Sequence, residues 1–252
     1  MRSVLVLFLA AGCADDLPEG SLLERTRVLA VSARPAGDAT RAWPRPGEET
    51  ALTFLLAGPA DLPPMSWAAT LCVKDAQGCA PFLSTQGSGR PEVRFVAPEA
   101  DRLVLVAQVV PDGEPETVVA MELGVERQAA NHHPRAPELS LAGRPWGEAC
   151  EPVGAAPVEI AVATRGDDRE PFIDGDGAAQ RETLRLSFFA TAGELEGQFR
   201  VVEPTDPDDK IVSMTWTPPE MPDGGLEMRF TVVARDLRGG VAWTQRALCA
   251  SK

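Results

Sequence analysis

The chain has 252 residues, of which 44 % are hydrophobic and 24 % charged, and it carries a formal net charge of −13 at pH 7. A surface this acidic repels phosphate groups, so we expect no nucleic-acid partner and no general electrostatic attraction to anionic lipid headgroups. The length suits either two β-domains of ordinary size or one larger all-β unit.

The first thirteen residues are built like an export signal. Arg2 supplies the positive start, residues 4–9 the apolar stretch, and Ala10-Ala11-Gly12 the small residues that signal peptidases accept, directly before Cys13. This ending resembles the lipobox of bacterial lipoproteins, in which the cysteine sulfur receives diacylglycerol, the preceding peptide is removed and the new amino terminus is acylated by a fatty acid such as palmitate. The resemblance implies a signal peptide over residues 1–12 and lipidation of Cys13. It departs from the commonest pattern in having Ala10 three residues before the cysteine.

The residue after the lipobox, Ala14, indicates which membrane the lipoprotein would be sorted to. Ala14, not aspartate, follows Cys13, which by the sorting rule of enteric bacteria implies a lipid-anchored protein of the cell outer membrane, facing the periplasm or the exterior. The alternative is a plain secretory signal that leaves Cys13 an ordinary cysteine. A transmembrane anchor is not expected, because residues 3–14 give an apolar run of about a dozen residues and a span needs about 20.

A short acidic segment with Pro18 and Gly20 follows the lipobox. Such a composition predicts a flexible, lipidated tether over residues 13–24, short enough to keep the first domain close to the membrane.

Beyond the tether, short apolar runs and alternations are separated by Pro, Gly and Asp clusters, with no sustained period of 3.6 residues. This pattern predicts β-strands. In the first domain, residues 25–127, the expected strands are 26–33, 50–57, 65–73, 92–96, 103–110 and 118–125.

A polar, proline-rich linker is expected over residues 128–137, where Asn131-His132-His133 precedes Pro134. Both histidines are expected to be solvated there. The second domain, residues 138–252, repeats the strand pattern at 157–164, 183–191, 198–202, 211–216, 227–235 and 241–248. We therefore predict an all-β fold of two tandem antiparallel β-sandwiches.

The second half resembles immunoglobulin-like and PKD-like modules of bacterial surface proteins. The resemblance lies in Ser187-Phe188-Phe189-Ala190, in the tryptophan strand of residues 212–219, and in the closing strand of residues 230–235 with Asp236-Leu237-Arg238-Gly239-Gly240 after it. It implies an immunoglobulin-like β-sandwich used for spacing, adhesion or docking. Trp67 and Trp216 are expected in the cores.

The remaining cysteines, Cys72, Cys79, Cys150 and Cys249, form an even set in a chain bound for an oxidising compartment. Four cysteines allow three pairings. We favour Cys72 with Cys79 and Cys150 with Cys249, because each disulfide bond then lies within one predicted domain. Free buried thiols are the alternative.

One acidic loop has the composition of a calcium site. It offers Asp167, Asp168, Asp174 and Asp176 around glycines, with Glu182 within reach, and calcium takes about six to eight oxygen ligands. The loop lacks the spacing of an EF-hand, so a solvated acidic turn is the competing interpretation. No other cofactor is expected.

No nucleophile elbow, phosphate-binding loop or zinc-protease motif occurs in the sequence. We therefore predict a non-catalytic envelope lipoprotein that binds, adheres or acts as a scaffold, with an envelope protein or a glycan as partner. The alternatives are a calcium-dependent adhesin and an envelope enzyme that processes saccharides.

Overall fold

The computed structural model describes residues 20–75, 78–126, 130–220 and 225–250, and Cys13 lies outside them. Within these ranges the chain is all-β, as predicted, with one short 3-10 turn at Gly166–Asp168. No helix in the described ranges is long and apolar enough to cross a membrane.

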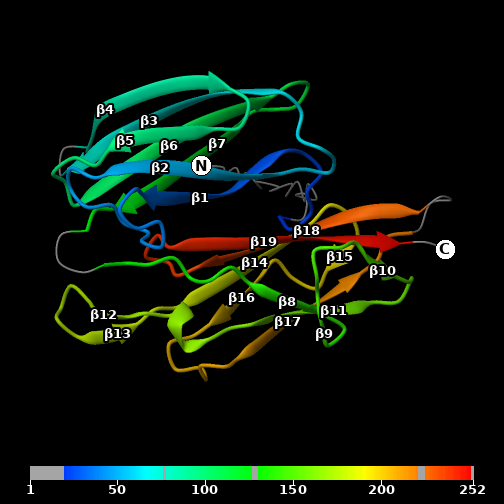
Figure 1. Ribbon diagram of the computed structural model, residues 1–252. Helices are drawn as coiled ribbons and strands as arrows, with labels where there is room; N and C mark the ends of the chain where they lie inside the picture. The colour runs from blue at the N-terminus through cyan, green and yellow to red at the C-terminus, as the bar shows by residue number, and fades with distance from the viewer. Residues whose placement is uncertain (1–19, 76–77, 127–129, 221–224, 251–252) are drawn as a thin grey trace, which may run out of the picture.

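The first half of the chain forms two facing sheets, drawn at the top of Figure 1. One is three-stranded, in the order β1-β2-β5, and the other four-stranded, in the order β4-β3-β6-β7; all their pairs are antiparallel. The strands are β1 (Arg27–Pro35), β2 (Glu49–Ala57), β3 (Met65–Asp75), β4 (Gly78–Ser88), β5 (Glu92–Val96), β6 (Arg102–Pro111) and β7 (Thr117–Gly124).

The second half also forms two sheets, in the orders β10-β19-β18-β14-β16 and β15-β17-β11-β8-β9. A separate hairpin, β12–β13, extends from one end (Figure 1). The strands are β8 (Glu138–Leu141), β9 (Arg144–Pro145), β10 (Glu151–Val153), β11 (Val158–Ala163), β12 (Pro171–Ile173), β13 (Ala179–Arg181), β14 (Leu184–Ala190), β15 (Glu194–Leu195), β16 (Phe199–Val202), β17 (Ile211–Thr217), β18 (Leu226–Arg235) and β19 (Val241–Ala250).

Each pair of sheets encloses its own apolar cluster. The cluster of the first half draws its buried residues from Val31 to Val125, and that of the second from Leu139 to Leu248. Trp216 is fully buried in the second and meets Phe230 edge-on, with ring centroids 5.1 Å apart. Alternating apolar side chains on the strands form these interiors, and their burial is the main stabilising contribution to the fold.

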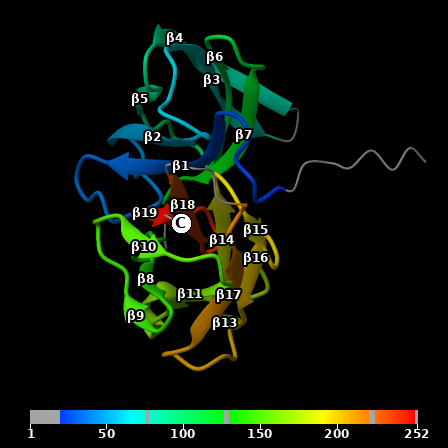
Figure 2. The ribbon, with the colours of Figure 1, turned by 90° about the vertical axis from the view of Figure 1, so that its right-hand side faces the viewer.

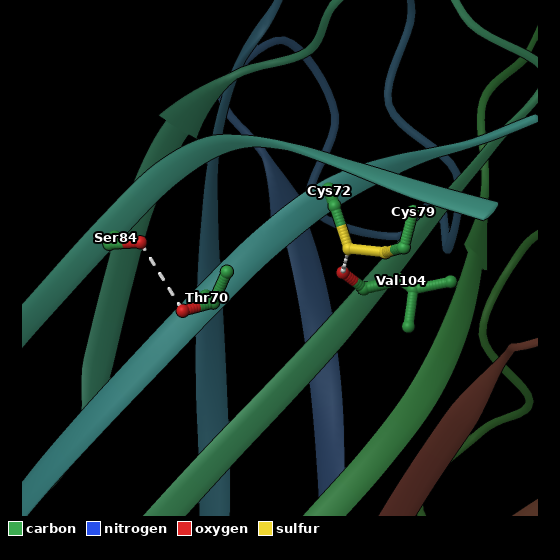
Figure 3. Close-up of a disulfide and its surroundings, with 5 residues drawn as sticks. All are labelled: Thr70, Cys72, Cys79, Ser84 and Val104. Carbon is green, nitrogen blue, oxygen red and sulfur yellow. Dashed lines mark hydrogen bonds between the residues drawn. A yellow bond between two sulfur atoms is a disulfide. The ribbon is translucent and has the colours of Figure 1, made fainter.

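Both favoured disulfides are present. Cys72 is bonded to Cys79 between the neighbouring strands β3 and β4, where the Cys72 sulfur also lies 3.7 Å from the carbonyl oxygen of Val104 (Figure 3). Cys150 is bonded to Cys249, 99 positions away, and joins the β10 end of the second half to its last strand. The prediction of one local and one long-range pairing is thereby confirmed.

A third apolar cluster joins the two halves. It combines Leu55 of β2 and Leu29 of β1 with Val233 of β18 and Val241 of β19. Figures 1 and 2 both show β1 lying against the sheet that contains β18 and β19. Part of the outer face of that sheet is thus covered by the first half, and we call this contact the junction.

The end of the predicted tether belongs to the junction. Ser21 and Leu23 are 2 % and 1 % exposed, and Leu23 is a member of the junction cluster. The Leu23 amide donates to the carbonyl of Ala190 at 2.8 Å, and the Ala190 amide donates to the carbonyl of Ser21 at 3.0 Å. Ser21 and Leu23 of the expected flexible segment are therefore packed against the fold, because burial of Leu23 is favourable, and residues 13–19 lie outside the described ranges.

The predicted solvated linker is also ordered by contacts. Asn131 is fully buried, and its carbonyl accepts from the Ala42 amide at 2.7 Å. The His133 amide donates to the Thr40 carbonyl at 2.8 Å, so residues 131–133 run alongside the segment before Trp43. The expectation of solvation is wrong for His133, whose ring bonds to both halves, whereas the His132 side chain is 39 % exposed and pairs with Glu170.

Candidate functional site

A hollow of about 780 Å³ opens at the junction. One wall consists of β1 and β7 of the first half, and the other consists of β12 with the turn between β18 and β19. We call it the junction cleft. Its apolar lining includes Val31, Trp43, Val119, Met121, Phe172, Ile173 and Leu237.

Two exposed apolar side chains stand on the second wall. Ile173 is 68 % exposed and Leu237 is 62 % exposed, which places them among the most exposed large apolar residues described. Leu237 also has a φ of 64°, in the left-handed region where a side chain costs about 1–2 kcal/mol. An exposed leucine in a strained backbone conformation does not stabilise the free protein. Such a residue is typical of a binding position.

The turn that holds Leu237 is fixed by Asp236. One carboxylate oxygen of Asp236 accepts the amides of Arg238 and Gly240, both at 2.8 Å, and the other accepts the side-chain amide of Asn131 at 3.1 Å. A side chain at position 240 would meet that carboxylate at 1.9 Å, so only glycine fits there. The turn predicted from the glycines is present. The hydrogen bonds of the buried Asp236 hold Leu237 at its positive φ.

Arg238 lies between two aromatic rings at the base of the cleft. Its guanidinium is 4.9 Å from the ring centroid of Trp43 and 4.6 Å from that of Phe172, and it pairs with Glu182 at 2.8 Å. The Trp43 indole donates back to the Arg238 carbonyl at 2.9 Å. Stacked cations of this kind are worth about 0.5–2 kcal/mol each, so the stack fixes the width of the cleft.

Two buried carboxyls lie behind this stack. Burial, followed by the charge of Asp236, raises the pKa of Glu182 to about 7. Burial also raises the pKa of Asp236. Glu182 accepts the Glu170 amide at 2.9 Å, so it also holds the base of the β12–β13 hairpin.

His133 connects the halves from the other side of the turn. Its Nδ1 accepts the Val241 amide at 3.0 Å, which leaves the proton on Nε2 to donate to the Ala33 carbonyl at 2.7 Å. Burial lowers the pKa of His133, in agreement with a neutral ring. His132 instead pairs with Glu170 at 2.7 Å. The two rings have different partners, and both connect segments that are distant in the sequence.

The four aspartates of the predicted calcium loop are not brought together. The exposed Asp167 and the buried Asp168 belong to the 3-10 turn, where Asp168 pairs with Arg135 at 3.1 Å. Asp174 caps the tip of the β12–β13 hairpin by accepting the amides of Asp176 and Ala178. Within the described ranges, no three His, Cys, Asp or Glu side chains are grouped as metal ligands.

Sequence reasoning missed Trp43, Phe172 and Arg238 as partners. They lie in three separate segments, and only the tertiary fold brings them together. The one available signal was Leu237 within an Asp-x-x-Gly-Gly turn, a position where polar residues and glycine are favoured.

Comparison with known proteins gives distant likenesses only. No family model and no curated protein matches the chain. A red sea bream transglutaminase structure aligns with 88 % of this chain and 31 % of its own, at 10 % identity and a TM-score of 0.28. A Salmonella alpha-2-macroglobulin structure, reacted with methylamine, aligns with 89 % of this chain and 16 % of its own, at 10 % identity and a TM-score of 0.29. The chain thus spans less than a third of either protein, and scores this low carry no inference about activity.

Proposed function

We propose that the chain is a non-catalytic, lipid-anchored binding module of the bacterial cell envelope. In this proposal it consists of two tandem immunoglobulin-like sandwiches, is anchored at the outer membrane through Cys13, and works as an adhesion or scaffolding part. The partner is another envelope protein, which docks in the junction cleft. Calcium has no part in the proposal, because the candidate aspartates are engaged at separate places.

The observation that carries the proposal is Leu237, an apolar side chain that is both exposed and held at positive φ in the cleft wall. Ile173 faces the same cleft from the neighbouring hairpin. Burying a leucine or isoleucine side chain contributes about 1.5–3 kcal/mol, so the two together supply an apolar anchor for a protein surface. A glycan would leave most of this apolar area unmatched, and for that reason we favour a protein.

The test is site-specific photo-crosslinking in native envelope, with the photoreactive residue at position 237 or at position 211. Ile211 is the matched control, since it is 70 % exposed and begins β17 in the sheet that faces away from the first half. We expect a discrete crosslinked protein from position 237 and none from position 211. Equal products from both positions would contradict a binding site at the cleft.

A Leu237→Gly variant then separates binding from stability. Glycine relieves the strain at positive φ while adding chain entropy to the unfolded state, so the free energy of unfolding should change by less than about 1 kcal/mol. Capture of the same protein, by a photoreactive residue placed at position 173, should fall at least about tenfold. Undiminished capture by this folded variant would show that the Leu237 side chain does not bind the partner.

A further inference from the structure

Arg185 of β14, Arg235 of β18 and Arg27 of β1 lie on or against the outer face of the sheet that contains β14, and none has a carboxylate partner among the described residues. Arg185 and Arg235 are direct cross-strand neighbours on β14 and β18. Arg27, at the start of β1, lies over the ring of Phe189 at 5.9 Å. None of the three forms an ion pair with any described acidic side chain, although the chain contains 37 acidic residues.

The strand geometry places Arg185 beside Arg235, and the contact with Phe189 places Arg27 further along the same face. Leu184, Leu186 and Phe188 point into the second core, so Arg185, Ser187 and Phe189 share the opposite face of β14. From Arg185 to Phe189 the strand advances four residues, which corresponds to about 13 Å. We call Arg185, Arg235 and Arg27 along this face the arginine row.

Each guanidinium of the row is held by neutral groups. Arg185 stacks on the ring of Phe199 at 4.1 Å. Arg235 donates to the Ser187 hydroxyl at 3.5 Å and to the Leu29 carbonyl. Arg27 donates to the Gly20 carbonyl at 2.8 Å. These contacts orient the guanidinium groups, and no carboxylate within the described ranges compensates their charge.

An uncompensated row of cations costs free energy in the empty protein. Burial, and then the neighbouring charge of Arg185, lowers the pKa of Arg235, and burial together with Arg25 lowers that of Arg27. A bound oxyanion would offset both the desolvation and the repulsion. Guanidinium groups match phosphate oxygens in geometry and bind them by paired, charge-assisted hydrogen bonds.

We propose that Arg185 and Arg235, the direct neighbours of the arginine row, bind a phosphate group, and that its source is the headgroup of an anionic phospholipid. The choice of source rests on the proposed lipid anchor. Gly20, which Arg27 contacts, is only seven residues from Cys13, and seven residues span at most about 25 Å. The row therefore lies within reach of the headgroups of the membrane that would hold the lipid.

The test uses the full chain in neutral detergent micelles, titrated calorimetrically with short-chain phosphatidylglycerol, with phosphatidylcholine of the same chain length, and with glycerol phosphate. We expect phosphatidylglycerol to bind and phosphatidylcholine to bind at least about tenfold more weakly, with affinity falling as salt rises. Binding of glycerol phosphate as tight as that of phosphatidylglycerol would keep the phosphate site and overturn the lipid as its source.

The variant for this test is Arg185→Gln, because Arg185 is exposed and its loss leaves the cores intact. The matched control is Arg144→Gln, which removes the same charge from the exposed strand β9 at the far edge of the second half. We expect about tenfold weaker phosphatidylglycerol binding for Arg185→Gln and no change for Arg144→Gln. Equal affinities of the two variants, or no binding by the unaltered chain, would overturn the site.

The two proposals fail separately. Crosslinking at position 237 reports on the protein partner whether or not lipid binds. Mass spectrometry showing an unmodified Cys13 on the mature chain would remove the anchor and the argument for a lipid source, while the effect of Arg185→Gln on glycerol phosphate binding would still decide the phosphate site.

Discussion

The two halves of the molecule have similar sheets but contribute differently to the junction. The first half presents mainly strand backbone and apolar side chains, such as Leu29 of β1 and Leu55 of β2, and its Asp61, which pairs with Arg229, is exposed. The second half presents the charged groups Glu182, Asp236 and Arg238. The second half therefore acts as a chemically detailed platform, and the first half as the wall that closes the cleft over it.

The disulfides sharpen the same contrast. The bond of the first half joins Cys72 to Cys79, seven positions apart in neighbouring strands, and restrains only one hairpin. The bond of the second half joins Cys150 to Cys249 over 99 positions and closes nearly the whole half. The half that carries the polar groups is thus also the half whose ends are linked covalently.

The largest expected effect follows from this difference. In the chain-entropy description, replacing Cys150 and Cys249 by alanine should lower the free energy of unfolding by about 4–5 kcal/mol, and replacing Cys72 and Cys79 by about 2–3 kcal/mol. Urea unfolding of the two double variants measures both values. A larger loss from the Cys72–Cys79 variant would contradict the view that the long-range bond restrains its half more strongly than the local one.

A smaller effect is expected from the buried acid of the platform. Glu182 has a pKa of about 7 in the fold against an ordinary value of 4.5, so between these values the folded chain holds a proton that the unfolded chain has released. The free energy of unfolding should therefore fall as pH rises through this window, by up to about 3 kcal/mol. Burial lowers the pKa of His133, whose contribution is lost as pH falls below about 6.5, the opposite direction.

The Glu182 contribution is isolated by substitution. Glu182→Gln should flatten the fall in stability between pH 5 and pH 8, measured by urea unfolding at each pH. The matched control is Glu138→Gln, whose carboxylate is 64 % exposed and pairs with Arg165 at the surface. If the two variants and the unaltered chain share one pH profile, Glu182 does not titrate as its burial requires.

Much of the strand pattern was predictable from the sequence. All twelve expected strands are present, with ends within two residues of those observed. Apolar alternation and turn residues carried these predictions, because each strand buries one face. The strand Gly78–Ser88 was missed, since it lies at a sheet edge, is exposed along most of its length and contains Pro81. Very short strands, such as Glu194–Leu195, give no period to detect.

The junction was less predictable for a physical reason. Net charge averages over the whole surface, so a value of −13 gave no sign that Arg185 and Arg235 would be left together without an acid. Asn131 and His133 are polar and precede a proline, which is typical of a solvated linker, yet they are needed as donors and acceptors between the halves. Their partners are distant in the sequence, and local pattern carries no information on such contacts.

The central claim is that residues 131–133 are an ordered segment that connects the two halves beside the junction cleft. Amide hydrogen exchange of this segment tests the claim most directly. The His132 amide is bonded to Glu170 and the His133 amide to Thr40. We predict that both exchange far more slowly than in an unstructured peptide, with protection comparable to that of the flanking strand β8. Exchange at the rate of a free peptide would show a flexible linker and contradict the account.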